Sequence, residues 1–264
     1  MSQSDSQPSA HTSAPGPQER GRVRIEPSPK RIRALVAGVV AADSRAPRLV
    51  WEKPYYPTYY LPAADVHAEL LDTGRVEASP DRGDGHVCDL RAAGRILPGA
   101  ALVCSDSARP ELRGLVRIAW DAMDQWLEED EPVYVHPRDP YKRVDILASS
   151  RHVQVGVDGV HVAESRQPRI LFETGLVPRY YLPMTDVRMD LLHPSETTSH
   201  CPYKGSATWW SVDTGHGAQP DLAWTYRSPL PESQKIAGLV AFYNELVDLH
   251  LDGQLQDRPR TPFS

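Results

Sequence analysis

The sequence predicts a mainly β protein with two tandem domains, each built from antiparallel sheets and one short helix. The first observation behind this prediction is that the chain repeats itself. One gapless match starts at Gly38 and Gly159 (159 − 38 = 121), and a later match starts at Gly114 and Gly238 (238 − 114 = 124). A period of about 120 residues is the size of a whole domain and is far longer than a solenoid repeat. Short alternating apolar runs are the second observation, and prolines that forbid helix across the aromatic segments are the third.

The longer match keeps charged and aromatic residues as well as glycine and proline. Its paired positions include Pro47 and Pro168, Arg48 and Arg169, Glu52 and Glu173, 59–62 and 180–183 (Tyr-Tyr-Leu-Pro in both copies), and Asp65-Val66 and Asp186-Val187. Because the same residue types recur at one offset, we expect the two copies to share a fold.

Each copy opens with a predicted β-hairpin. In the second copy, Asp158-Gly159 lies between alternating residues at 153–157 and 160–162. An Asp-Gly pair between alternating apolar residues is a strong hairpin signal. In the first copy, Ala37-Gly38 takes the corresponding place.

The end of each copy is ambiguous between helix and strand, because apolar residues near 110–128 also fit one helical face. Alternation near the end of the second copy favours a strand. We therefore expect a short helix and then a hairpin, with helices at 111–115 and 232–239 and hairpins at 116–127 and 240–251. Proline precedes both helices and suits a first helical turn.

The composition divides the chain into four segments. Residues 1–21 are rich in Ser, Pro, Gln and Gly and predict a disordered tail, not a signal peptide. An N-terminal β domain is expected at 22–131 and a C-terminal β domain at 151–264. The proline-rich segment 132–150 between them is a connector, which we expect to lie as a strap on the first domain.

Charge and cysteine content exclude several classes of function. A net charge of −6 argues against a general nucleic-acid binder. Cys88, Cys104 and Cys201 are too widely spaced for a disulfide framework or a zinc knuckle. Free thiols suit a reducing compartment, and no apolar run is long enough to span a bilayer. We expect a soluble, cytoplasmic protein that does not bind membranes.

The loop at 195–205 is the strongest candidate site, because it gathers reactive residue types that the first copy lacks. Cys201 is a candidate nucleophile or redox thiol, and the nearby Lys204 would favour its thiolate. His200 is a candidate partner base. The alternative is that Cys201 is a small buried apolar residue. A Cys-His pair without further ligand spacing is not a zinc motif, so no metal is expected.

Other residues of the second copy could converge on the same place. Glu173 is a candidate proton carrier, and Arg179 is a candidate ligand for an anionic group. The candidate aromatic ligand-binding residues are Tyr181, Tyr203, Trp224, Tyr226 and Tyr243. The alternatives are core packing for the aromatic residues and an ordinary ion pair for Glu173 and Arg179.

The first copy differs in this loop. Ser79 takes the place of the cysteine, Asp81 that of the tyrosine and Arg82 that of the lysine, although Glu52 is kept. Any chemistry of Cys201 therefore cannot occur by the same route in the first copy, which either binds something else or is structural.

Three motifs, at 52–60, 201–205 and 237–243, resemble the tandem form of domain-of-unknown-function family 427 over residues 22–263. That family is also filed under a nucleotidyltransferase-like label. The resemblance implies a β-tent fold, in which two antiparallel sheets meet at an angle, as in methionine sulfoxide reductase B and the thalidomide-binding domain of cereblon. Many members of that group hold a structural zinc through paired cysteines. This chain has no such pairs, so we expect no zinc and no other cofactor.

Three hypotheses about function follow. The first is a small-molecule pocket in the C-terminal domain, with a Cys-dependent reaction as one form of it. The second is a non-catalytic module that binds a ligand or peptide. The third is nucleotidyl transfer, for which the sequence offers neither a Gly-Ser with an Asp-x-Asp pair nor a glycine-rich phosphate loop. The sequence does not indicate the ligand, the reaction or the oligomeric state.

Overall fold

The structure of the protein, a computed structural model, describes residues 23–53 and 55–261. The predicted disordered tail at 1–21 lies outside the described residues. The described chain consists of strands and short 3₁₀ turns in two sets, which confirms the prediction of a mainly β, tandem architecture. Over these ranges, no helix has the length and apolar character needed to cross a bilayer. Two compact units divide near residue 122.

The first repeat contains a seven-stranded and a four-stranded antiparallel sheet. The larger sheet has the order β1 (Arg24–Pro27), β4 (Arg48–Trp51), β5 (Thr58–Pro62), β9 (Leu115–Ile118), β8 (Arg95–Val103), β7 (Gly85–Ala92) and β6 (Glu69–Glu77). The smaller sheet has the order β11 (Glu131–Val133), β10 (Gln125–Glu128), β2 (Ile32–Val36) and β3 (Val39–Ser44).

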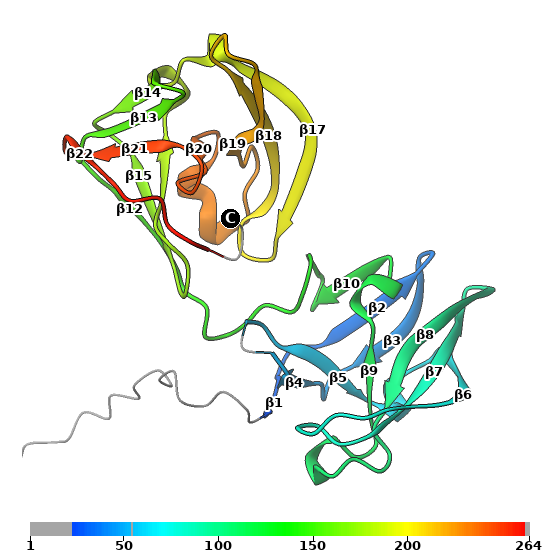
Figure 1. Ribbon diagram of the computed structural model, residues 1–264. Coiled ribbons are helices and arrows are strands. Elements are labelled where there is room, and N and C mark those ends of the chain that lie inside the picture. The colour runs from blue at the N-terminus through cyan, green and yellow to red at the C-terminus, as the bar shows by residue number, and fades with distance from the viewer. Residues whose placement is uncertain (1–22, 54, 262–264) are drawn as a thin grey trace, which may run out of the picture. The chain divides into compact units, whose positions relative to one another are not determined.

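The second repeat has the same two sheets in the same topology (Figure 1). The larger sheet has the order β12 (Val144–Ala148), β15 (Arg169–Glu173), β16 (Arg179–Leu182), β20 (Val240–Phe242), β19 (Ala218–Thr225), β18 (Gly205–Asp213) and β17 (Leu192–Cys201). The smaller sheet has the order β14 (Val160–Ser165), β13 (Val153–Val157), β21 (Asp248–Leu251) and β22 (Gln254–Leu255).

Within the described part of the chain, the helical segments are all short 3₁₀ turns. They are η1 (Ala63–Asp65), η2 (Pro110–Leu112), η3 (Trp120–Ala122), η4 (Met184–Asp186), η5 (Met189–Leu191) and η6 (Pro231–Ile236). The helices expected at 111–115 and 232–239 correspond to η2 and η6, and each has proline in its first turn as predicted.

The hairpin predicted around Asp158-Gly159 is confirmed. β13 and β14 pair antiparallel, and Val157 lies opposite Val160. Both turn residues have positive φ, +51° at Asp158 and +76° at Gly159, as a type I′ turn requires.

The hairpins predicted at 116–127 and 240–251 are wrong. β9 belongs to the seven-stranded sheet and β10 to the four-stranded sheet, so the chain crosses from one sheet to the other between them. β20 and β21 are divided in the same way. In the first repeat, the η3 turn makes the crossing, and the Asp124 amide then donates to the Leu35 carbonyl on β2 at 3.0 Å. Alternation identifies each strand, but it does not show which sheet the strand joins.

Apolar side chains cover both faces of the larger sheet of the second repeat. On one face, Leu182 and Phe242 pack with Val155 and Leu249 of the smaller sheet. Neighbouring residues of a strand point to opposite faces, so Tyr181 lies on the other face, which we call the aromatic face. There, residues of the larger sheet pack with Ile236 of η6. Figure 1 shows η6 as an orange coil inside the curve of this sheet.

Leu182→Ala should destabilise the second repeat by about 2–5 kcal/mol, because a fully buried leucine leaves a cavity when it is truncated. Leu147→Ala is the control: half of this side chain is exposed, and the expected change is within about 0.5 kcal/mol. Urea unfolding gives both free energies. Equal effects of the two substitutions would contradict the assigned core.

Candidate functional site

The turn between β17 and β18 carries Cys201 and Lys204. Cys201, which is half-buried, ends β17 and pairs with Gly205 at the start of β18. Gly205 has a φ of +94°, a conformation that side chains other than glycine rarely adopt. The Leu230 amide donates to the Lys204 carbonyl at 3.1 Å. The strand pairing of Cys201 with Gly205 and the hydrogen bond from Leu230 to Lys204 therefore both hold the turn in this conformation.

The Lys204 ammonium forms a buried ion pair with Glu173, which ends β15. Lys204 Nζ donates to Glu173 Oε2, and only 11% and 8% of the two side chains are exposed. Burial alone would lower the pKa of Lys204, but electrostatic interactions with Cys201 and Glu173 outweigh it and raise this pKa above its ordinary value. Lys204 therefore stays an ammonium, and it lies within electrostatic reach of the Cys201 sulfur.

Three aromatic rings pack against one another on the aromatic face. Trp209 and Trp224 are opposite each other on β18 and β19, with ring centroids 5.1 Å apart. Tyr243 completes the group, at 5.4 Å from Trp209 and 5.1 Å from Trp224. Trp209 and Tyr243 are only partly buried, so the cluster keeps ring surface open to solvent. We call these three residues the aromatic cluster.

Arg179 lies over the aromatic cluster and is held there by Glu245. Its guanidinium carbon lies 5.6 Å from the ring centroids of Trp224 and Tyr243, within cation–π range. Its two terminal nitrogens donate to the two Glu245 oxygens at 2.5 and 2.7 Å. Burial would raise the pKa of Glu245, but the hydrogen bonds from Arg179 and Thr261 lower it below its ordinary value. Arg179 thus already has a carboxylate partner, and its predicted role toward a ligand anion remains untested.

Three of the four predicted site tyrosines, Tyr181, Tyr203 and Tyr226, are buried phenols. Burial raises the pKa of Tyr181 to about 12, and its hydroxyl accepts a hydrogen bond from Trp224 Nε1 at 3.1 Å. Burial also raises the pKa values of Tyr203 and Tyr226 above the ordinary range. These three hydroxyls therefore remain protonated at neutral pH and are suited to hydrogen bonding.

His200 is the predicted site residue that the structure does not bring together with Cys201. The two are neighbours on β17, so their side chains point to opposite faces of the sheet. His200 Nδ1 lies 2.8 Å from Ser206 Oγ, and its ring stacks on Tyr134 at 5.6 Å. Glu173, not His200, is the titratable predicted residue on the side of Lys204.

Two residues of the site were not identified from the sequence, namely Trp209 and Glu245. Trp209 has the same alternation as Ala207, which lies on the aromatic face. Its neighbour Trp210 packs in the core on the other face of the sheet. The sequence of two adjacent tryptophans therefore does not show which of the two rings lies on the aromatic face. Glu245 is 66 residues from Arg179, and no local pattern joins them.

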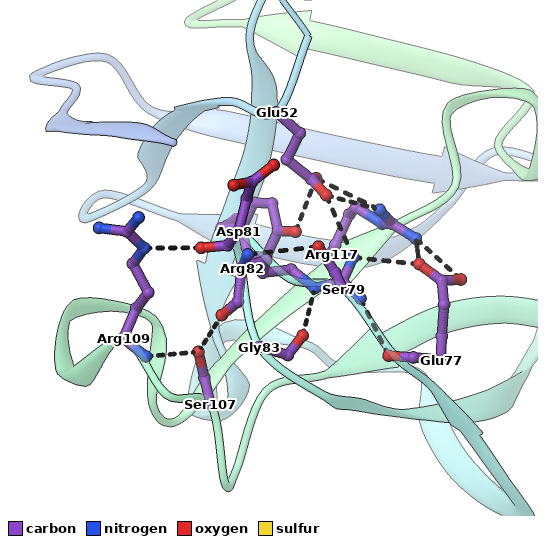
Figure 2. A network of polar contacts seen from close by, with 10 residues as sticks. Glu52, Glu77, Ser79, Asp81, Arg82, Gly83, Ser107, Arg109 and Arg117 are labelled. Carbon is purple, nitrogen blue, oxygen red and sulfur yellow. Dashed lines mark hydrogen bonds and ion pairs between the residues drawn. The ribbon is translucent and has the colours of Figure 1, made fainter. Parts of the chain in front are cut away.

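The equivalent place in the first repeat is filled by a closed network of charges (Figure 2). Arg82, with 1% of its side chain exposed, donates to Glu52 at 3.1 Å and to Glu77 at 3.0 Å. Arg117 donates to the same two carboxylates at 3.2 and 3.1 Å. The Tyr60 hydroxyl donates to Glu52 at 2.7 Å. Two guanidiniums thus balance two carboxylates, which indicates a structural role for this network.

The ladder pairs of the two sheets show how the second repeat differs. Where β18 and β19 pair Trp209 with Trp224, β7 and β8 pair Val87 with Leu102. Further along, Trp224 pairs with Ala241, and Leu102 pairs with Arg117. At equivalent positions, the first repeat therefore has Val87, Leu102 and Arg117, and the second repeat has Trp209, Trp224 and Ala241. The second repeat has two aromatic rings where the first has two aliphatic side chains, and it has a small alanine where the first has a guanidinium.

No group of three or more His, Cys, Asp or Glu residues placed to hold a metal ion occurs within residues 23–53 and 55–261.

Comparison with known proteins identifies one family. The family model described as a domain of unknown function, DUF427, matches residues 24–129 and again residues 145–253. Together the two matches cover more than half of the chain. No curated protein matches the sequence.

Arg82→Ala should destabilise the first repeat by roughly 3 kcal/mol, because it removes a buried cation and leaves the partly buried Glu52 to share Arg117 with the exposed Glu77. Arg75→Ala, at an exposed position on β6, should change stability by less than about 0.5 kcal/mol. Urea unfolding compares the two. A loss below about 1 kcal/mol for Arg82→Ala would show that the network is not structural.

The Arg179–Glu245 pair should make the second repeat sensitive to acid. Because the folded pKa of Glu245 lies below its ordinary value of 4.5, the pair stabilises above that pH and is lost as pH falls through the folded pKa. Unfolding between about pH 5 and pH 3 should show a shallower fall in stability for Glu245→Gln than for wild type. The exposed Glu196→Gln is the control and should follow the wild-type curve. Coincident curves for all three would refute the assignment.

Proposed function

The chain belongs to the DUF427 family in a tandem, two-domain form, and we propose that its second domain binds a small molecule at the aromatic face. One observation carries this proposal. The pair Trp209–Trp224, with Tyr243 beside it, replaces the aliphatic pair Val87–Leu102 of the first repeat, and Ala241 replaces Arg117 of its charge network. Partly exposed rings of this kind offer a stacking surface for a flat apolar group.

The polar groups beside the aromatic cluster suggest how a ligand would be oriented. Lys204 is a buried ammonium with further N–H donors beyond the one that binds Glu173. A ligand with a flat apolar part and a carbonyl or anionic oxygen would satisfy both the rings and this donor. The first repeat would serve as a structural partner, because its equivalent cation is enclosed by carboxylates.

A reaction of Cys201 is the second candidate function, and the buried Lys204 ammonium favours it. The Lys204 ammonium lies within electrostatic reach of the Cys201 sulfur, and Glu173 would hold this ammonium in place. In this proposal Glu173 replaces His200 as the acid–base group of the site, because His200 points to the other face. Nucleotidyl transfer remains a hypothesis from the family label alone, and a cytoplasmic location remains a prediction from the sequence.

A thermal-shift screen of small metabolites tests ligand binding directly. A ligand at 100 times its Kd stabilises its domain by about 2.7 kcal/mol, whatever the chemistry. Trp209→Val, which introduces the residue of the first repeat, should abolish the shift given by any hit. Trp51→Val, in the first repeat, is the matched control and should keep it. A thermal shift that survives Trp209→Val but is lost in Trp51→Val would place the ligand in the first domain. A shift that requires Mg²⁺ and a nucleoside triphosphate would favour nucleotidyl transfer.

Iodoacetamide labelling, mapped by mass spectrometry, tests the thiol. Cys88 and Cys104 are buried, so Cys201 should react first in the folded protein. Lys204→Met should slow that labelling about tenfold at pH 7, because the thiolate is the reacting form. An inert Cys201 in wild type would remove the second candidate function, while a ligand bound equally by Cys201→Ala would leave the first in place.

A further inference from the structure

The connector that precedes the second matched region is bonded to the turn that carries Cys201 and Lys204. Arg138 Nε donates to the Pro202 carbonyl at 3.0 Å. The Asp139 amide donates to the Tyr203 hydroxyl at 2.8 Å, in a buried hydrogen bond. Both acceptors lie between Cys201 and Lys204, so the connector bonds to the centre of the turn.

Ring contacts extend the same attachment. Tyr134 stacks on His200, and His136 packs edge-on against Tyr203 with ring centroids 6.3 Å apart. The connector therefore touches the turn at positions 200, 202 and 203. The sequence predicts a strap that lies on the first domain, whereas the contacts described here have a different partner. These contacts are with the second repeat, although the Arg138 amide also donates to Glu128 at 3.3 Å.

The C-terminal end of the connector is hydrogen-bonded to the residue that follows Glu173, the ion-pair partner of Lys204. Lys142 Nζ donates to the Thr174 carbonyl, and the Arg143 amide donates to Thr174 Oγ1, both at 3.0 Å. Thr174 directly follows Glu173. The connector thus spans from the turn that holds Lys204 to the strand end that holds its carboxylate partner.

The first repeat braces its own turn in a different way. There, Arg109 Nε donates to the Asp81 carbonyl at 2.7 Å, and Ser107 Oγ donates to the Arg82 carbonyl at 2.6 Å (Figure 2). Both donors lie inside the matched region 24–129. In the second repeat, the guanidinium that binds a turn carbonyl comes from residue 138, outside the matched region 145–253.

We propose that the connector is part of the second-domain site and that Arg138 is its positioning residue. By binding the Pro202 carbonyl, Arg138 holds the turn so that Lys204 stays against Glu173 and beside Cys201. The backbone of Asp139 and the hydroxyl of Tyr203 act with it. The importance of this arrangement for chemistry rests on the proposed role of Cys201 and Lys204, but the positioning itself can be measured without a ligand.

Amide hydrogen exchange of the turn, in the full chain, is the direct test. Arg138→Ala should speed exchange of residues 201–206 by about tenfold, because a hydrogen bond from a charged donor to the turn is lost. Arg143→Ala is the matched control, because its exposed side chain pairs with Asp145 on β12 and not with the turn. Arg138→Lys should restore part of the protection, because lysine can still donate to the same carbonyl.

Tyr203→Phe gives a second, independent variant, since it removes only the acceptor of the Asp139 amide. It should also speed exchange at 201–206, with little change in the exchange of the β13–β14 hairpin. Iodoacetamide labelling of Cys201 should rise about threefold in Arg138→Ala, as the turn opens more often. Unchanged exchange in both variants would overturn the positioning role. Faster exchange with an inert wild-type Cys201 would leave the positioning role in place and remove only the reactive thiol.

Discussion

A buried cation bound to a carboxylate at a strand end is the interaction on which both repeats depend. It is Lys204 with Glu173 in the second repeat and Arg82 with Glu52 in the first. Removing charges from water is costly, so each cation can be buried only while its partner carboxylate stays in place. This requirement ties the β17–β18 turn to β15, and the corresponding turn of the first repeat to the end of β4. The turn and the aromatic face are therefore fixed relative to each other.

The two repeats then use this shared arrangement differently. In the first, Glu77 and Arg117 complete a balanced network that leaves the cation no further role. In the second, Ala241 takes the place of Arg117, and tryptophans occupy the space along the neighbouring ladder. An exchange of charge for aromatic surface makes the second face suitable for stacking. The same face of the larger sheet thus carries a balanced charge network in the first repeat and partly exposed aromatic rings in the second.

Much of the architecture could be predicted from the sequence, because it depends on local patterns and on the repeat. The constant offset placed Glu52 and Glu173 in equivalent positions, and Asp158-Gly159 located a hairpin. The sheet to which β10 or β21 belongs could not be predicted, since alternation carries no information about the partner strand. Adjacency in the sequence suggests that His200 and Cys201 act together, yet neighbouring residues of a strand point to opposite faces of the sheet. Glu245 and Arg138 act over long sequence distances, which only the fold reveals.

Binding of a small molecule at the aromatic face of the second repeat, as proposed above, can be measured directly by NMR. Indole N–H resonances from a ¹⁵N-labelled protein, assigned by single Trp→Phe variants, report on each tryptophan separately when a thermal-shift hit is titrated. We expect the Trp209 and Trp224 signals to move together and to saturate, while those of Trp51, Trp120 and Trp126 stay in place. Movement confined to the three tryptophans of the first repeat would contradict the claim.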